Sequence, residues 1–244
     1  MCGRYTLSTT KPADLAARLG VAGARLAPEA LGRANVCPTE EVLGVVTDPE
    51  GARHPVMLRW GLAPSWASLK GMRPLINARD DKLRSSTAWR SLARDSRHRC
   101  LVAADGWLEW QRAEDPKQPR QPFLHRLRAG GPASDGAAEP GAPFAFAGLW
   151  TIARPKDAPG EIASCTIVTV PASAEAARLH DRMPAVLRSP DEEAAWLSRN
   201  VDLDGAIDLV RPLPEGSLEI TPVSRELNGA GNGSDQLSLL SGAT

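Results

Sequence analysis

The chain contains 244 residues, of which 42% are hydrophobic, and this is enough apolar material for the core of one globular domain. Basic and acidic residues number 29 each, so the net charge of zero excludes binding to nucleic acid through an overall positive charge. Any DNA site must therefore be a local basic patch. No apolar run approaches the roughly 18 residues of a membrane-spanning helix, and the first ten residues lack the apolar segment of a secretion signal. We expect a cytoplasmic protein of the bacterial type, with no membrane partner.

The first half of the chain is expected to hold a short helix followed by paired strands. Residues 12–21 carry apolar side chains at helical spacing, and a threonine before them is the expected N-cap. Residues 42–47 and 56–60 are typical of strands, and the turn at 48–51 between them predicts a hairpin. A helical stripe over residues 83–92 follows.

Residues 99–103 are expected to form a buried strand, which turns into a further strand over 107–111. Successive side chains of a strand point to opposite faces. Glu109 therefore shares a face with Trp107 and points away from the face that carries Leu108.

The second half of the chain is expected to add four strands and two short helices. The predicted strands cover 123–127, 144–150, 163–170 and 185–187, and the predicted helices cover 172–179 and 190–198, the latter with Ser189 as its cap.

Two segments are expected to stand apart from this core. Residues 129–142 are rich in Gly, Ala and Pro, which is typical of a mobile hairpin insertion. Residues 229–244 are predicted to be a loosely held C-terminal tail, although Leu237, Leu239 and Leu240 could dock on the domain.

The four cysteines do not indicate a metal site. They are scattered without CxxC spacing, which in a cytosolic chain argues against both a zinc site and a disulfide framework. We expect no metal and no cofactor. Cys100 and Cys165 lie in apolar runs, which predicts inert core positions.

Cys2 is the candidate reactive group. Loss of Met1 would leave it with an α-amine and a thiol on adjacent carbons, with reference pKa values of about 7.7–8.0 and about 8.5, so both are partly reactive at neutral pH. The pair can capture an aldehyde as an imine and close on it through sulfur. The product is a thiazolidine, and closure is intramolecular, with an effective molarity of roughly 10⁵ M or more. Taken alone, however, a cysteine at position 2 is most often incidental.

Four separated segments accompany one another in this chain: residues 1–4 (MCGR), 77–79 (NAR), 105–110 (DGWLEW) and 180–184 (HDRMP). Together, in this order, they resemble the SRAP family (SOS response-associated peptidase, abasic-site processing proteins). Further segments similar to family blocks are 35–38, 59–66 and 222–224.

The resemblance implies one α+β domain over residues 1–228, with a β-barrel-like core of mostly antiparallel strands flanked by short helices. It also implies a protein that senses abasic sites in single-stranded DNA. Such a protein would link to the ring-opened sugar as a thiazolidine through Cys2, after removal of Met1, and so shield the lesion during the DNA damage response. We expect it to act as a monomer.

The resemblance implies catalytic roles for four residues. Cys2 matches the nucleophile, and Asn77 matches a residue that hydrogen-bonds near the reacting sugar. Glu109 matches the acid/base carboxylate, and His180 matches the histidine that assists ring opening and proton transfer.

A second group of residues is expected to contact DNA. Arg4 and Arg79 would hold backbone phosphates, and Trp66 would stack on a base, which is worth ~1–3 kcal/mol per base. A half-buried core position explains Trp66 equally well. The remaining candidates are Pro38, Arg84 and Arg90, and helix-surface arginines are usually just solvated.

The chain also departs from the family pattern. Leu108 stands where an aromatic residue is common, and Ala34 stands where a tyrosine is frequent. Asp80 and Asp81 add negative charge next to Arg79. These departures leave the chemistry intact and make the DNA footprint harder to predict.

The chemistry of an abasic sugar agrees with the implied roles. The sugar is mostly a closed hemiacetal, so a proton must leave its 1-hydroxyl and reach the ring oxygen, and a carboxylate with an imidazole suits that task. Glu109 and His180 would supply these groups. Considered singly, a glutamate between tryptophans and a lone histidine are each more often structural.

Two other functions use the same residues. A thiol peptidase would use Cys2 as an N-terminal nucleophile, with Glu109 or His180 as base, and could remove Met1 from itself. A non-catalytic module for single-stranded DNA would keep a basic channel and have no use for a free amine on Cys2.

Overall fold

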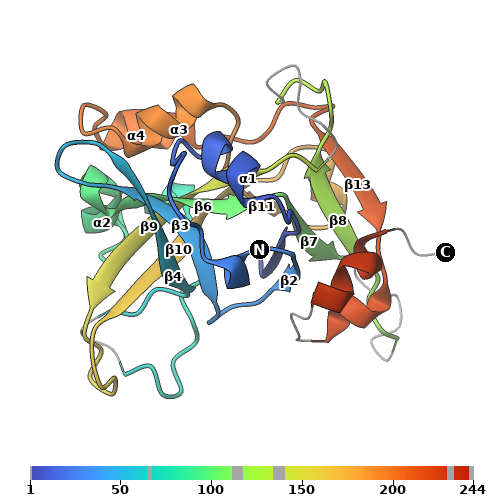
Figure 1. Ribbon diagram of the computed structural model, residues 1–244, viewed down its shortest axis with the longest axis horizontal. Coiled ribbons are helices and arrows are strands. Elements are labelled where there is room, and N and C mark those ends of the chain that lie inside the picture. The colour runs from blue at the N-terminus through green and yellow to red at the C-terminus, as the bar shows by residue number, and fades with distance from the viewer. Residues whose placement is uncertain (1, 65–67, 112–117, 134–140, 230–233, 242–244) are drawn as a thin grey trace.

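A computed structural model describes residues 2–64, 68–111, 118–133, 141–229 and 234–241. The fold is mixed α+β, built mostly of strands with a few short helices (Figure 1), as the sequence predicts. None of the helices in the described ranges is long and apolar enough to cross a membrane.

The larger sheet has eight strands and forms a barrel-like core. Its strand pairings run from β10 through β4, β3, β6 and β9 and back to β10, but only two residue pairs join β4 to β10 and only two join β3 to β6. The barrel is therefore not strictly closed. The strands are β3 (Glu41–Thr47), β4 (Arg53–Trp60), β5 (Asn77–Arg79), β6 (Arg99–Ala104), β9 (Phe144–Ala153), β10 (Ile162–Pro171), β11 (Arg182–Pro184) and β12 (Val186–Leu187).

The second sheet has five antiparallel strands in the order β13-β8-β7-β1-β2 and stands beside the larger sheet in Figure 1. Its strands are β1 (Arg4–Leu7), β2 (Arg33–Val36), β7 (Gly106–Trp110), β8 (Pro122–Leu127) and β13 (Leu218–Pro222). The predicted strands at 42–47, 56–60, 99–103, 107–111, 123–127, 144–150, 163–170 and 185–187 are confirmed to within a few residues, whereas β1, β2, β5, β11 and β13 were not predicted.

The two sheets share an aromatic core and a polar joint. Tyr5 of β1 contacts Trp60 and Phe146 of the larger sheet edge-on, at centroid distances of 5.2 and 5.8 Å. At the β6–β7 junction the buried carboxylate of Asp105 accepts hydrogen bonds from Thr6 and from the backbone amides that follow β1. These hydrogen bonds hold β1, and with it the N-terminal segment, where the two sheets meet.

Gly106 is required at this junction. A Cβ atom added there would lie 2.9 Å from the carbonyl oxygen of His125, from Leu124 and from the hydroxyl of Thr6. Any side chain would therefore push β7 away from β8 and β1.

The helices are short: α1 (Pro12–Arg18), α2 (Arg90–Arg94), α3 (Pro190–Leu197) and α4 (Leu203–Leu209). The predicted Ser189 cap of α3 is confirmed, because its hydroxyl accepts from the amide of Glu192 at 3.2 Å. The predicted threonine cap of α1 is wrong. The helix begins at Pro12, so Lys11 rather than a threonine occupies the N-cap, and its side chain forms no capping hydrogen bond.

Short 3-10 turns replace two predicted helices. The segment 172–179 forms only η4 (Ala176–Arg178), and the stripe over 83–92 becomes helical only from Arg90, after η2 (Asp80–Lys82). The other turns are η1 (Pro28–Ala30), η3 (Ser96–His98), η5 (Arg225–Asn228) and η6 (Ser234–Leu240).

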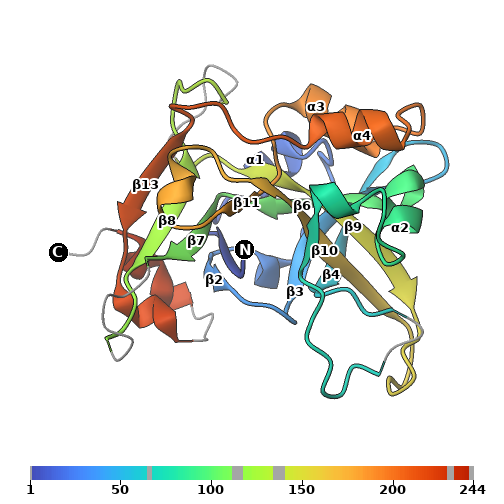
Figure 2. The same cartoon turned by 180° about the vertical axis from the view of Figure 1, so that it is seen from behind.

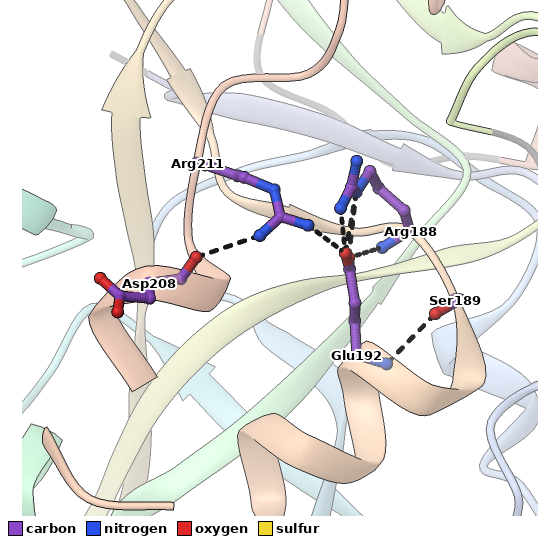
Figure 3. A network of polar contacts seen from close by, with 5 residues as sticks. All are labelled: Arg188, Ser189, Glu192, Asp208 and Arg211. Carbon is purple, nitrogen blue, oxygen red and sulfur yellow. Dashed lines mark hydrogen bonds and ion pairs between the residues drawn. The ribbon is translucent and has the colours of Figure 1, made fainter. Parts of the chain in front are cut away.

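An ion-pair network holds α3 and α4 together (Figure 3). Glu192 of α3 pairs with Arg188 and, at 2.9 Å, with Arg211, which also donates to the carbonyl of Asp208 at the end of α4. This network is partly exposed and far from the N-terminal segment in sequence, so we assign it a role in holding the helices only.

The predicted insertion at 129–142 lies half outside the described residues. In the predicted C-terminal tail, η6 packs on β2, and Leu240 is buried against Ala34, Leu108 and Leu227.

Candidate active site at the N-terminal segment

Cys2 is fully buried just before β1, near the end of β7 that carries Glu109. The antiparallel register pairs Arg4 with Leu108 and Tyr5 with Trp107, so the chain ahead of Arg4 runs toward Glu109. Burial, followed by the negative charge of Glu109, raises the pKa of the Cys2 thiol well above its usual range. The thiol is therefore neutral in the folded chain.

Asn77 holds Cys2 from the other sheet. Its side-chain amide donates a 2.8 Å hydrogen bond to the backbone carbonyl of Cys2. Asn77 is fixed by β5, which runs parallel to β10 with Asn77 opposite Ile167. The side-chain oxygen of Asn77 is buried and accepts no hydrogen bond from the described residues, so it is available to a ligand.

Glu109 is 7% exposed and lies on the same face of β7 as Trp107, as the strand alternation predicts. Leu108 belongs to the separate apolar cluster on the opposite face. Burial raises the pKa of the Glu109 carboxyl from about 4.5 to about 7, and the charge of Asp181 acts in the same direction. A carboxyl that is half ionised near neutral pH is suited to proton transfer.

His180 enters from the loop between η4 and β11 and is about one-third exposed. Its Nδ1 lies 3.0 Å from the backbone amide nitrogen of Arg182. Asp181 lies 2.8 Å from the same Nδ1. The charge of Asp181 also helps to raise the pKa of the Glu109 carboxyl.

The four residues expected to be catalytic thus come together. Asn77 contacts Cys2 directly, Glu109 acts on the Cys2 thiol through its charge, and the His180 loop acts on Glu109. They come from the segment before β1, from β5, from β7 and from the segment before β11, which are far apart in the sequence.

Arg4 is engaged by the protein itself. Its guanidinium donates to the carbonyls of Leu227 and Gly229 at 3.1 and 3.0 Å, and to the side-chain oxygen of Asn35 at 2.9 Å. It also lies 5.6 Å from the ring centroid of Trp110. Arg4 therefore ties the N-terminal segment to the C-terminal one, a contact that the sequence does not reveal.

Arg79 is half exposed and forms a two-pronged ion pair with Asp81 at 2.9 and 3.0 Å. Its neighbour Asp80 pairs with the buried Arg182 at 2.5 Å. The two acidic residues next to Arg79 thus have different partners: Asp81 pairs with Arg79, and Asp80 pairs with Arg182. Exposed pairs of this kind contribute only ~0–1 kcal/mol, so a phosphate could compete for Arg79.

The remaining DNA-contact candidates are dispersed. Pro38 is partly buried directly after β2 and Cys37. Arg84 pairs with Asp204 of α4 at 2.8 Å, and Arg90 lines a groove of about 1280 Å³ between α2 and the segment leading into α4. This groove shares no lining residue with the Cys2 site. Trp66 lies outside the described residues.

Two residues near the site were not singled out from the sequence. Arg182 lies two residues after His180 and is buried against Asp80 and Thr169. Phe123 lies directly opposite Glu109 in the β7–β8 pairing. The hairpin register between residues 107–111 and 123–127 could have placed Phe123 there, but only if the turn between the strands had been known.

A model of the SOS response associated peptidase (SRAP) family matches residues 1–230. The chain belongs to the SRAP family. It is 32% identical over 237 residues to the abasic site processing protein YedK of Escherichia coli (strain K12), which covers 95% of this chain and 96% of the relative.

A second relative agrees with the assignment to the SRAP family, and a solved structure shares the fold. The abasic site processing protein YoqW of Bacillus subtilis (strain 168) is 31% identical over 242 residues, covering 97% of this chain and 98% of the relative. The crystal structure of a protein from Bacteroides thetaiotaomicron has the same fold, with a TM-score of 0.77 at 20% identity and full coverage of both chains.

Proposed function

We propose that this protein captures abasic sites in single-stranded DNA by forming a covalent thiazolidine through Cys2, once Met1 has been removed, and so shields the lesion. The naming of its SRAP relatives as abasic site processing proteins supports the choice of substrate. The clustering of a cysteine at position 2 with Asn77, Glu109 and His180 supports the chemistry.

The proposed reaction has three steps. The sugar ring opens when the 1-hydroxyl loses a proton and the ring oxygen gains one, which yields an aldehyde. The α-amine of Cys2 attacks this aldehyde and water leaves, which gives an imine. The sulfur of Cys2 then adds to the imine carbon, its proton passes to the nitrogen, and the five-membered ring closes.

Glu109 suits the proton transfers in the first and last steps. With a pKa of about 7 its carboxyl can accept a proton from the sugar hydroxyl or from the thiol, and can return it to nitrogen. The raised pKa of the Cys2 thiol makes such a base necessary for closure. His180, which is about one-third exposed, is the candidate proton donor to the ring oxygen.

Asn77 suits a positioning role. Its hydrogen bond fixes the carbonyl of Cys2, and its buried oxygen is available to orient the sugar. One chain supplies every group in this scheme, so we infer that a monomer suffices. A single-stranded substrate is proposed because the sugar must leave any base stack to reach the buried Cys2.

A thiol peptidase is supported less well by the same geometry. Its nucleophile would be the Cys2 thiolate, and cysteine nucleophiles have a lowered pKa in a positively charged setting. Burial and Glu109 both raise the pKa of this thiol instead. An imine formed first on the amine does not need a thiolate.

The proposal rests most directly on the 2.8 Å contact that holds Cys2 within reach of Glu109. The test is to incubate the protein with an oligonucleotide carrying one abasic site and to look for a band that survives denaturation. We expect that band with the mature protein and not with protein whose α-amine is acetylated. A peptidase or a purely non-covalent binder would give no such band.

A further inference from the structure

A groove of about 440 Å³ lies beside the candidate active site, within the roughly 300–1,000 Å³ range of small-ligand sites. Its floor is one face of the second sheet, with Phe123 of β8 and Ile220 of β13, and its opposite wall is the η4 segment with Arg178 and Leu179. In Figure 2 the segment leading into β11 passes across β8.

Two residues of the groove lining are direct neighbours of Glu109 and His180, the residues proposed to move protons. Phe123 is directly opposite Glu109 in the β7–β8 pairing, and opposite residues of an antiparallel pair project their side chains on the same face. At the other wall, Leu179 immediately precedes His180. The groove therefore lies next to the candidate active site.

The charges at the rim favour an anion. Arg128 and Arg178 both line the groove and are exposed, and Arg128 donates to the carbonyls of Gly216 and Leu218 at 3.2 and 2.8 Å. The one acidic residue of the lining, Glu175, accepts from the backbone amides of Gly216 and Leu218 at 2.8 and 3.3 Å, so its charge is held by the protein. The groove thus combines an aromatic and aliphatic floor with a positive edge.

We propose that this groove binds the nucleotide next to the abasic site, with its base against Phe123 and its phosphate near Arg178. The inference rests on the function proposed above. An abasic sugar has no base that the protein could bind. The affinity for the lesion must therefore come from the neighbouring nucleotides. Stacking on an aromatic ring accepts every base, which matches a lesion that occurs in any sequence context.

The experiment compares two abasic oligonucleotides of equal length. In one, ordinary nucleotides flank the lesion. In the other, both neighbours are tetrahydrofuran spacers, which keep sugar and phosphate but carry neither base nor aldehyde. We expect the first to reach half-maximal adduct formation at a concentration about tenfold lower, as the loss of one stacked base predicts. Equal concentrations would overturn the inference while leaving the proposed function intact. Absence of adduct with both would overturn the proposed function itself.

Variants test whether Phe123 causes the difference between the two oligonucleotides. Phe123→Ala should bring the two half-maximal concentrations together, whereas Phe123→Trp should keep them apart because it still stacks. Ile152→Ala is the matched control, since Ile152 is a 55% exposed apolar residue on β9, outside the groove. Each ratio is measured within one variant, so a partly unfolded preparation does not change it. A tenfold ratio that persists in Phe123→Ala would overturn the inference.

Arg178 is tested through salt dependence on the base-flanked oligonucleotide. Removing one phosphate contact should reduce the slope of log affinity against log salt by about 0.7 for a single strand. We expect that reduction for Arg178→Ala and not for Arg154→Ala, whose side chain is exposed and lies outside the groove. Equal slopes in the two variants would contradict the phosphate contact.

Discussion

The side-chain amide of Asn77 donates to the backbone carbonyl of Cys2 at 2.8 Å, and this contact joins the two sheets at the proposed reaction centre. It holds the residue that would react without touching its sulfur. Asn77 is therefore a positioning residue, and removing it should slow the reaction without changing the product.

For Asn77→Ala we expect the rate of adduct formation to fall by about tenfold, the equivalent of one hydrogen bond of ~1.4 kcal/mol. The final yield should be unchanged. Time courses on denaturing gels measure both quantities. A loss of yield at long times would show that Asn77 does more than position Cys2.

The Cys2→Ala variant tests the role of the thiol separately from that of the α-amine. The variant keeps the α-amine and should still form an imine, which borohydride traps. Without borohydride the imine cannot close, so it should dissociate or lead to strand scission by β-elimination. A heat-stable crosslink formed by Cys2→Ala without borohydride would contradict closure through sulfur.

Glu109 links catalysis to stability. Its folded pKa of about 7 lies above the ordinary value of about 4.5, so the folded state favours the protonated carboxyl. The associated stabilisation is fully present below pH ~4.5 and is lost as the pH rises through 7, by about 3 kcal/mol in total. Glu109→Gln carries no such charge.

The difference in unfolding free energy between Glu109→Gln and the wild type should therefore shift in favour of the variant between pH 5 and pH 8. Urea denaturation at the two pH values measures it. Adduct formation by Glu109→Gln should at the same time be about 10²–10⁴-fold slower, the usual effect of losing a general acid or base. A stability difference independent of pH would mean that Glu109 is not buried as described.

Asp81 is predicted to restrain DNA binding. Its two-pronged pair with Arg79 is exposed, so replacing Asp81 by Asn removes a competitor for the guanidinium at little cost in stability. We expect Asp81→Asn to bind single-stranded DNA more tightly at low salt, and Arg79→Ala to lower the salt slope by about 0.7. Fluorescence anisotropy at several salt concentrations measures both. Unchanged binding in both variants would remove Arg79 from the DNA site.

Much of the strand framework could be predicted from local sequence, because alternation and turns are local signals. The face of β7 that carries Glu109 followed from side-chain alternation alone. The engagement of Arg4 could not be predicted, because its partners Leu227 and Gly229 lie more than 220 residues away. The pairing of Arg84 with Asp204 could not be predicted for the same reason, because only the fold brings these two residues together.

The most direct test of the central claim is the intact mass of the adduct formed on an abasic oligonucleotide and isolated after heating. The account predicts the mass of the chain without Met1, plus the oligonucleotide, minus one water, because amine, thiol and aldehyde join with loss of a single water. A heat-stable adduct that still contains Met1 would contradict the account, because no free amine would then stand beside the thiol of Cys2.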